Sequence, residues 1–365
     1  MASAARPLVK IGILSIGDMG AGLARLLGAH GFAVATNCGG RGPDTVARAR
    51  AAGVELLADD RALVRACGLV LSVVPPRDAH AIARRVLAAL DAEDAETPSP
   101  PEPLYFADLN AVAPSTVRDI AALFAPRAAA AVAAEAPGPR PREVRFVDGC
   151  ILGLPPAPKT PAPDAPSSSS SSSPSSVADD DLAAVLEQTW TRPRIPTSGP
   201  WGLASIAGHG PRLAAVLASS AVGADVGAAS GLKMCFAAVS KGFIALATQS
   251  FATARALGVL PALEAELAAV LPHHHAAAVR GVVAMPPKAY RWVAEMREIA
   301  RTLADDGGFQ VGGGGFDAAA ELFRLVAEDT VLGQEKIGKR SRGTTVEDVA
   351  AAVVEGVAKK RKKEE

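Results

Sequence analysis

Aromatic residues are scarce in this sequence, at 4% of 365 residues, and the formal net charge is zero, with 38 basic and 38 acidic side chains. Without an overall charge, nothing draws the chain to nucleic acid or to an anionic membrane. Residues 1–10 lack the apolar core of a signal peptide. The four cysteines are scattered without C-x-x-C spacing, so we expect reduced thiols, no metal site and a cytoplasmic protein.

A glycine-containing turn near the start of the chain predicts a dinucleotide site. The apolar run Ile11–Ile16 leads into this turn, and a periodic apolar segment follows at once. Gly17 allows the backbone to approach a pyrophosphate, Gly20 allows the helix to pack against the strand, and the first helical N–H groups face the anion. Ser15 takes the first position of the usual G-x-G-x-x-G pattern. The cofactor-binding residues expected in this turn are Gly17, Asp18, Met19 and Gly20.

The loop after the second expected strand distinguishes NADP from NAD. An NAD site usually has an acidic residue about 20 positions after the glycines, which binds the ribose 2′-hydroxyl. Here no Asp or Glu follows Thr36 until Asp44, and the loop contains Asn37 and Arg41. A small polar side chain and a guanidinium suit a 2′-phosphate, so we predict NADP. The alternative is that Arg41 is an ordinary surface arginine.

Strands and helices alternate through the first part of the chain, which predicts an α/β fold with a parallel, doubly wound sheet of the Rossmann type. After the first strand and helix, the expected strands are 32–36, 54–57, 69–74, 104–107 and 145–150. The expected helices between them are 44–52, 60–67, 79–90 and 114–124. An acidic, proline-rich stretch, 91–103, and a serine-rich insert, 154–181, interrupt this order, and we expect both to be disordered loops.

From residue 227 onward the pattern is almost wholly helical. Segment 232–258 is apolar around most of its circumference, which is typical of a helix buried between domains or in a subunit interface. Lys241 and Arg255 are among the polar residues that interrupt it, so we expect no membrane span. Further helices are expected over 260–271, 290–303 and 316–333. We therefore expect a Rossmann domain over 1–226, an all-α domain over 227–345 that binds substrate and forms a homodimer, and a charged solvated tail over 346–365.

Three strand ends meet at the carboxyl edge of the predicted sheet, where ligands bind in such folds. The first strand end contains Val74 and Pro75, the second contains Asn110, and the third contains Asp148. Asn110 is the best polar candidate among them, and we expect it to line the nicotinamide side together with Val74 and Pro75. Asp148 has an alternative role as a structural cap.

Lys233 is the candidate acid or base. We expect it in the first turn of the long apolar helix, where a positive charge is disfavoured by the helix dipole and by burial. Both effects favour the neutral amine, which is the form that accepts a proton. Ser240 lies seven residues further on, at nearly the same angle around the helix. The alternative is that Lys233 extends to solvent from the helix end.

Taken together, these segments resemble the β-hydroxyacid dehydrogenase superfamily, which includes 6-phosphogluconate dehydrogenase, and within it a group with a short, poorly characterised C-terminal domain. The motifs that carry the resemblance are SIGDMG (15–20), SVVPP (72–76), DLNAVAP (108–114), DGCILG (148–153), GAASGLK (227–233) and KAYRWVAEMREIA (288–300). The resemblance implies a catalytic role for Lys233. It implies substrate binding by Asp148, Ile151, Gly153, Ala237 and Ser240.

The chain departs from the family pattern at substrate positions. The family's asparagine four residues after the lysine is Ala237 here, and the serine of the substrate motif is Leu152. We therefore expect an NADP-dependent oxidoreductase that acts on a small hydroxy acid or keto acid, with Lys233 as general acid/base. One alternative is a reductase of another carbonyl or of an imine. The other is a non-catalytic, NADP-binding regulatory protein.

Overall fold

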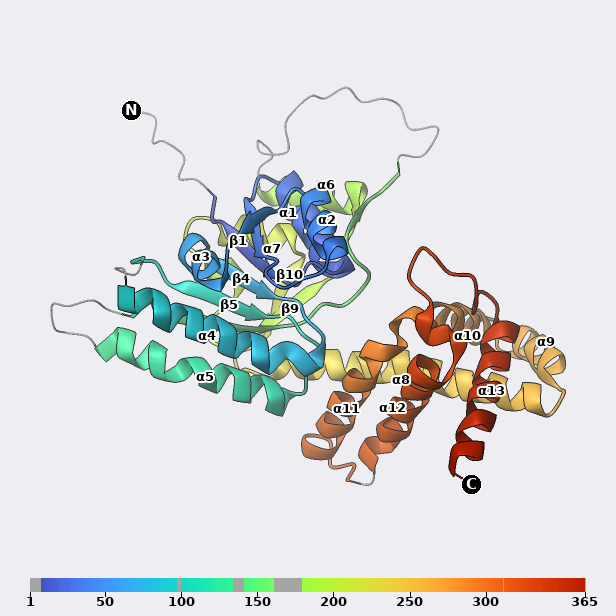
Figure 1. Cartoon of the computed structure of the whole chain (residues 1–365). Coiled ribbons are helices and arrows are strands. Elements are labelled where there is room, and N and C mark those ends of the chain that lie inside the picture. Colours follow the sequence, from blue (N-terminus) through green and yellow to red (C-terminus); the bar gives the residue numbers. More distant parts are fainter. Residues whose placement is uncertain (1–7, 97–99, 134–140, 161–178, 311, 365) are drawn as a thin grey trace. The chain divides into compact units, whose positions relative to one another are not determined.

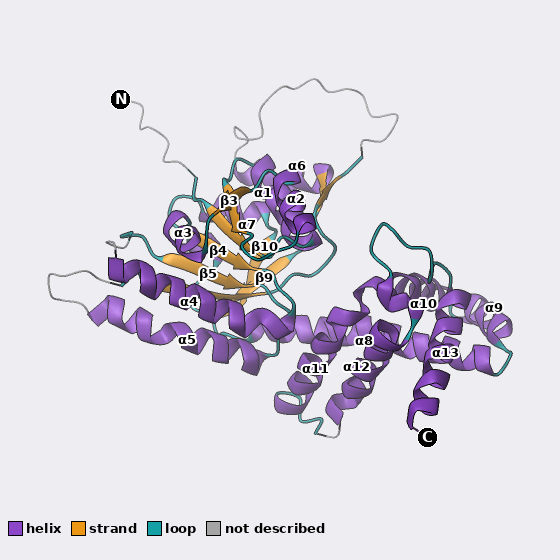
Figure 2. Ribbon diagram, viewed as in Figure 1, coloured by secondary structure: helices purple, strands orange, loops and turns teal. Residues whose placement is uncertain are grey.

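The computed structural model describes residues 8–96, 100–133, 141–160, 179–310 and 312–364 (Figures 1 and 2). The chain divides into two compact units, Met1–Lys233 and Met234–Glu365. The division falls within one long helix, α8 (Ala228–Ala256), whereas the sequence analysis placed the boundary just before that helix.

The first unit is built on an eight-stranded sheet with the order β10-β9-β6-β5-β4-β1-β2-β3. Its strands are β1 (Ile11–Leu14), β2 (Val34–Asn37), β3 (Glu55–Leu57), β4 (Leu69–Ser72), β5 (Leu104–Asp108), β6 (Val144–Gly149), β9 (Ile195–Ser198) and β10 (Ser219–Gly223). Strands β1 to β6 are parallel, in the doubly wound order that the sequence predicts. The expectation of a wholly parallel sheet is corrected by β9, which pairs antiparallel with β6. Such antiparallel additions are common at the edges of doubly wound sheets.

Helices cover both faces of this sheet (Figure 2). They are α1 (Asp18–Ala29), α2 (Pro43–Ala51), α3 (Asp60–Ala66), α4 (Ala79–Glu96), α5 (Pro114–Ala133), α6 (Asp179–Thr189) and α7 (Gly210–Val216). In β4, Leu71 packs in the cluster that contains side chains of α1 and α7, whereas its neighbour Val70 packs with those of α3, α4 and α5. This alternation explains why the strand reads as a continuous apolar run.

Two segments that the sequence predicts as disordered loops, 91–103 and 154–181, differ from that prediction in part. Helix α4 continues to Glu96, so the first part of the segment expected as a loop, 91–103, is helical. The reason is that this part is rich in Ala and Glu, both good helix formers, and its prolines come only later. The serine-rich insert, 154–181, lies mostly outside the described residues. Its described ends are not loops throughout: β7 (Ala157–Pro158), inside the insert, pairs with β8 (Trp190–Thr191), and α6 begins at Asp179. Pairing with β8 thus orders part of a segment whose composition predicts a loop.

The second unit is helical, as predicted. Besides the remainder of α8, it contains α9 (Leu260–Val270), α10 (Pro272–Ala284), α11 (Ala289–Asp305), α12 (Phe316–Arg324) and α13 (Val346–Glu364). Trp292 packs edge-on against Phe323 with ring centroids 5.2 Å apart. Beside them, Lys241 forms an ion pair with the buried Glu295, and its Nζ lies 5.3 Å from the Trp292 ring centre. The inward residues of the 288–300 motif therefore tie α11 to α8.

The expected charged tail, 346–365, forms α13 instead. Val346, Val349, Ala350 and Val353 are buried, and their spacing gives this helix one apolar face. The basic residues lie only at the end of this segment, after the buried positions, so the segment as a whole is not a charged tail. Among the described helices, α8 alone has the length and apolar composition of a membrane span, a test that core helices of soluble proteins also pass.

Candidate functional site

The turn between β1 and α1 has the backbone geometry of a dinucleotide turn. Ser15 has a φ of +78°, in the left-handed region that favours glycine, so a serine stands where the usual motif has its first glycine. A Cβ on Gly20 would lie 2.2 Å from the carbonyl oxygen of Ser15, which excludes any larger residue there. Gly17 is the N-cap of α1 and has no side-chain cap. The first N–H groups of α1 are therefore available to a ligand.

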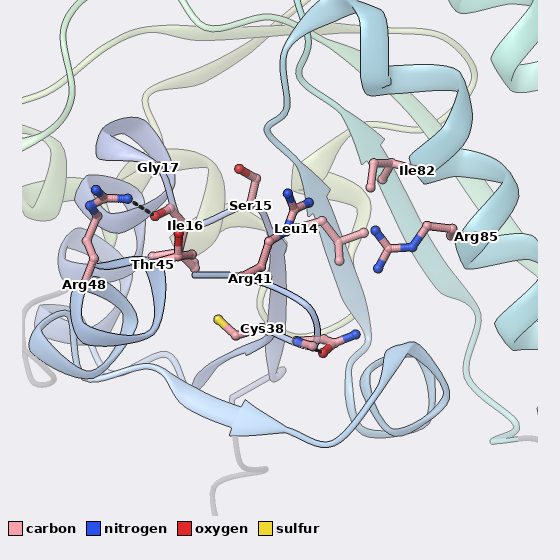
Figure 3. A pocket seen from close by; sticks show the side chains of 12 residues that line it. Leu14, Ser15, Ile16, Gly17, Cys38, Arg41, Thr45, Arg48, Ile82 and Arg85 are labelled. Atoms are coloured by element: carbon pink, nitrogen blue, oxygen red, sulfur yellow. Dashed lines mark hydrogen bonds between the residues drawn. The ribbon is translucent and has the colours of Figure 1, made fainter. Parts of the chain in front are cut away.

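A pocket of about 100 Å³ adjoins this turn (Figure 3). Its lining combines the turn with the loop after β2 and with side chains of α2 and α4: Leu14, Ser15, Ile16, Gly17, Asn37, Cys38, Gly39, Arg41, Thr45, Arg48, Ile82 and Arg85. Three of these residues are arginines and none carries a carboxylate. The lining therefore suits phosphate groups.

The three arginines are held differently. The guanidinium of Arg48 donates to the carbonyl oxygen of Ile16 at 2.9 Å, the dashed contact in Figure 3. The guanidinium of Arg85 makes a bidentate ion pair with Asp60, in which Nε donates to Oδ2 and Nη2 donates to Oδ1, both at 3.0 Å. The exposed side chain of Arg41 makes no hydrogen bond or ion pair with any described residue. Arg41 is therefore the arginine most available to a ligand phosphate.

The side chain of Asn37 holds the loop after β2 in place, whereas the sequence predicts only a contact with the cofactor. Its Oδ1 accepts from the backbone N–H of Gly39 at 2.7 Å, and its Nδ2 donates to Asp60 at 2.9 Å. It therefore shapes the loop that presents Arg41, while still lining the pocket.

The sequence analysis missed Arg48, Asp60 and Arg85 at this site. They come from α2, α3 and α4, and only the packing of these helices against the sheet brings them together. The one available signal was that Asp60 begins a helix directly after β3, at the carboxyl edge of the sheet. Of the other turn residues, Asp18 lies 3.9 Å from Arg48, and the half-buried Met19 packs against the core.

Asp148 ends β6 and caps the long helix α8. This fully buried carboxylate accepts hydrogen bonds from the Ser198 hydroxyl at 2.7 Å, the Ser230 hydroxyl at 2.7 Å and the Gly227 N–H at 2.8 Å. A negative charge with several donors at a helix N-terminus is strongly favoured. These contacts match the capping role that the sequence left open for Asp148.

Lys233 follows on the same helix. It is the sixth residue of α8 and thus lies in the second turn, where the sequence analysis had expected the first. The half-buried Nζ donates to the carbonyl oxygen of Ile151 at 2.7 Å. The structure therefore places Lys233 beside the predicted substrate motif, which it contacts at a backbone carbonyl.

Asn110 links the ends of two neighbouring strands. Its Oδ1 accepts from the N–H of Val74 at 2.7 Å, and its Nδ2 donates to the Ser72 hydroxyl at 2.9 Å. The buried Asn110 thus fixes the loop that carries Val74 and the half-buried Pro75.

Asp108 stands just before Asn110. Its Oδ1 accepts from the N–H of Asn110 at 3.0 Å, whereas Oδ2 is buried and has no hydrogen-bond partner among the described residues. Burial raises the pKa of Asp108 to about 7, hydrogen bonds from Asn110 oppose the rise, and the nearby Asp148 carboxylate adds to it.

Gly153, Ala237 and Ser240 are the remaining predicted substrate residues. Gly153 is exposed and has a φ of +132°, beside the bridge between Leu152 and Arg194. Ala237 is buried, and the Ser240 hydroxyl donates to the carbonyl oxygen of Phe236, one turn back in α8. Both belong to the second unit. No cluster of three metal-ligating side chains occurs among the described residues.

Two family models match parts of the chain. Residues 10–95 match the family described as NADP oxidoreductase, coenzyme F420-dependent, and residues 254–326 match a domain of unknown function (DUF1932). The first match covers the turn and the arginine-lined pocket. Residues 10–95 are therefore similar to an NADP-dependent oxidoreductase family, in agreement with the predicted cofactor NADP.

Solved structures share the fold at low identity. A 3-hydroxyisobutyrate dehydrogenase of Mycobacterium tuberculosis, solved with L-serine, is 15% identical, with 95% of this chain and 98% of that chain covered and a TM-score of 0.55. A 3-hydroxyisobutyrate dehydrogenase of Salmonella typhimurium is 16% identical, with 94% and 99% covered and the same TM-score. A conserved hypothetical protein of Sinorhizobium meliloti is 21% identical, with 96% of each chain covered and a TM-score of 0.53.

No curated protein matches the sequence. The two domain matches and their order along the chain agree with the predicted NADP-binding domain followed by a short C-terminal domain of unknown function, and the solved 3-hydroxyisobutyrate dehydrogenases share the fold.

Proposed function

We propose that this protein is an NADP-dependent dehydrogenase or reductase that interconverts a small hydroxy acid and its keto acid. The observation that carries the proposal is the pocket beside the glycine turn, with three arginines and no carboxylate in its lining. The ribose 2′-hydroxyl of NAD usually needs a carboxylate, whereas the 2′-phosphate of NADP needs a cation. Arg41 would bind the 2′-phosphate, with Asn37 shaping the loop around it.

The bound cofactor would accept or supply the hydride at nicotinamide C4. Lys233 would take the proton from the substrate hydroxyl as the hydride leaves the carbon, and would return it in the reductive direction. Its Nζ is held by the Ile151 carbonyl, which orients the amine at the end of β6. Asp148 would act as a positioning residue, because it anchors the first turn of the helix that carries Lys233.

A small hydroxy acid is supported by the solved relative that contains L-serine, which is a hydroxy acid. The alternative substrate class is a carbonyl or imine without a carboxylate. It is favoured by Leu152 and Ala237, two apolar residues at positions where the family pattern has polar ones.

The test is turnover by the Lys233→Met variant, measured by NADPH absorbance on a panel of hydroxy acids, ketones and cyclic imines. We expect kcat to fall by about 10²–10⁴-fold, the usual contribution of a general acid/base, while the Kd for NADPH stays nearly constant. Lys10→Met is the control, because Lys10 pairs with Glu55 on the surface at 2.8 Å.

Loss of NADPH binding in the Lys233 variant would contradict the assigned role. Turnover of imines alone would favour the alternative substrate class. Tight NADPH binding without turnover of any compound would favour the non-catalytic regulatory protein.

A further inference from the structure

A second and larger cavity, of about 490 Å³, lies at the opposite edge of the sheet from the cofactor turn. Its lining includes Val9, Gly68 and Pro103, which directly precede or adjoin the starts of β1, β4 and β5, and Arg142, which precedes β6. The cavity is therefore at the amino edge of the strands, whereas the glycine turn is at the carboxyl edge. Its volume is within the usual range for small-molecule sites.

Arg142 supplies a buried cation to this cavity. Its side chain is 5% exposed, and its guanidinium donates to the backbone carbonyl oxygens of Val64 and Glu102. It forms no ion pair with any described carboxylate, and its Nη2 donates to no described acceptor. The carboxylates of Glu102 and Asp94 act on this guanidinium from nearby without pairing with it, so its hydrogen bonds go to neutral carbonyls and it can still bind an anion.

His209 provides the second polar group. Its side chain is 7% exposed, it lines the cavity, and its Nε2 is buried without a hydrogen-bond partner among the described residues. Buried polar atoms of this kind are rare in folded proteins because they lose their hydrogen bonds to water. A bound ligand would satisfy this nitrogen.

The other two arginines in the lining, Arg65 and Arg145, are each paired with a carboxylate. Arg65 pairs with Glu93 at 2.6 Å. Arg145 pairs with Glu143 at 2.8 Å, donates a hydrogen bond to the Tyr105 hydroxyl oxygen at 2.9 Å, and lies 4.0 Å from the Trp201 ring centre. Glu102 contributes the one carboxylate in the lining against three arginines.

The rest of the wall is apolar or neutral. Val9, Pro103 and Ile206 line it, together with the thiol of Cys67. Burial raises the pKa of Cys67 to about 12, so this thiol stays uncharged at neutral pH. A ligand that fits such a wall has an apolar body and a small anionic head.

We propose that this amino-edge cavity is a second ligand site, which takes a small organic anion with an aromatic or alkyl body and binds its head group through Arg142 and His209. The proposal does not depend on the chemistry at the carboxyl edge. It assigns the cavity to a ligand distinct from the dinucleotide.

The test is calorimetric titration of the full chain with benzoate and with phenyl phosphate, at saturating NADPH, together with NMR of the histidine ring nitrogens. We expect one molecule to bind per chain and to shift the ring resonances of His209. The His209→Phe variant should weaken binding by about tenfold or more, equivalent to one lost hydrogen bond to a charged group. The tighter of the two compounds identifies the preferred head group, and either result supports the site.

Ile206→Trp is the second variant, because it fills the cavity without removing a polar group. It should also weaken binding by at least about tenfold. His273→Phe is the matched control, since His273 is an exposed histidine of α10 in the second unit. The proposal is overturned if neither compound binds at millimolar concentration, if both cavity variants bind as well as the wild type, or if NADPH competes with the compounds.

Discussion

At the scale of single residues, Asp108 combines deep burial with an unsatisfied oxygen at the end of β5. Because its folded pKa is raised to about 7, the folded protein keeps a proton there that the unfolded chain releases near pH 4. Between these pH values the folded state binds more protons, so the free energy of unfolding falls as the pH rises. Above about pH 7 this stabilisation is absent.

We therefore predict that Asp108→Asn, which stays neutral at every pH, removes this fall. Urea unfolding near pH 5 and near pH 8 should show a smaller loss of stability in the variant than in the wild type. Asp119→Asn is the control, because Asp119 is exposed on α5. Equal losses in the Asp108 variant and the wild type would show that Asp108 is already ionised in the folded protein.

Ser15 and Gly20 show how local geometry made the turn predictable. Gly20 is required because a Cβ would collide with the Ser15 carbonyl, and such a requirement is visible in the sequence as a glycine at fixed spacing. The roles of Asn37 and Asn110 were harder to predict. Asn37 donates to Asp60, 23 residues away, and Asn110 contacts Val74 and Ser72, 36 and 38 residues away. Sequence spacing does not reveal these partners.

At the scale of elements, the N-terminus of α8 depends on Asp148. The carboxylate is fully buried and receives the hydroxyls of Ser198 and Ser230 and the N–H of Gly227. We predict that Asp148→Ala lowers the free energy of unfolding by about 3 kcal/mol or more, because it leaves several buried donors without an acceptor.

Chemical denaturation of Asp148→Ala beside Asp225→Ala measures this effect. Asp225 is exposed and lies just before α8, so its loss should change stability little. Asp148→Asn keeps an acceptor oxygen and should fall between the two. A cost for Asp148→Ala no larger than that for Asp225→Ala would contradict the capping role.

The elements with a clear apolar pattern were predictable and those without one were not. Strands β1 to β6 and helices α1 to α5 follow from alternating apolar segments. Strand β9 has the same length as β1, four residues, but it contains Pro196, which is unusual within a sheet, so nothing in its sequence marked it. Helix α10 begins with Pro272 and three histidines, a composition with little apolar periodicity.

In the 288–300 motif, the sequence is likewise insufficient to tell a binding site from a packing surface. A tyrosine and an arginine such as Tyr290 and Arg297 can bind a substrate anion or lie on a helix surface, and sequence alone does not separate the two; here both side chains are more than half exposed. The packing contacts of the motif come from Trp292, which contacts Phe323 of α12, and from Glu295, which pairs with Lys241 of α8.

At the scale of the whole molecule, we propose a homodimer. In the second unit, α8 exposes Phe236, Val239 and Leu246, with exposed fractions of 50%, 77% and 67%. Large apolar side chains along one helix usually mark an interaction surface. A second copy of this chain is the partner that the family resemblance implies.

We predict that light scattering finds a dimer at micromolar concentration and that Val239→Glu combined with Leu246→Glu produces a monomer. The substitution places charges on the surface that the partner would cover. Leu257→Glu is the control, because Leu257 is exposed beyond the end of α8. A monomeric wild type would leave these side chains in water and would contradict the proposed dimer.

The central claim concerns the dinucleotide, and calorimetric titration with NADPH and then NADH tests it most directly. We predict that the wild type prefers NADPH by at least about tenfold. The Arg41→Ala variant should lose most of this preference while its Kd for NADH stays nearly unchanged, because only the 2′-phosphate contact is removed. Equal affinity for the two cofactors, or a preference for NADH, would contradict the assignment of the arginine-lined pocket to the 2′-phosphate of NADP.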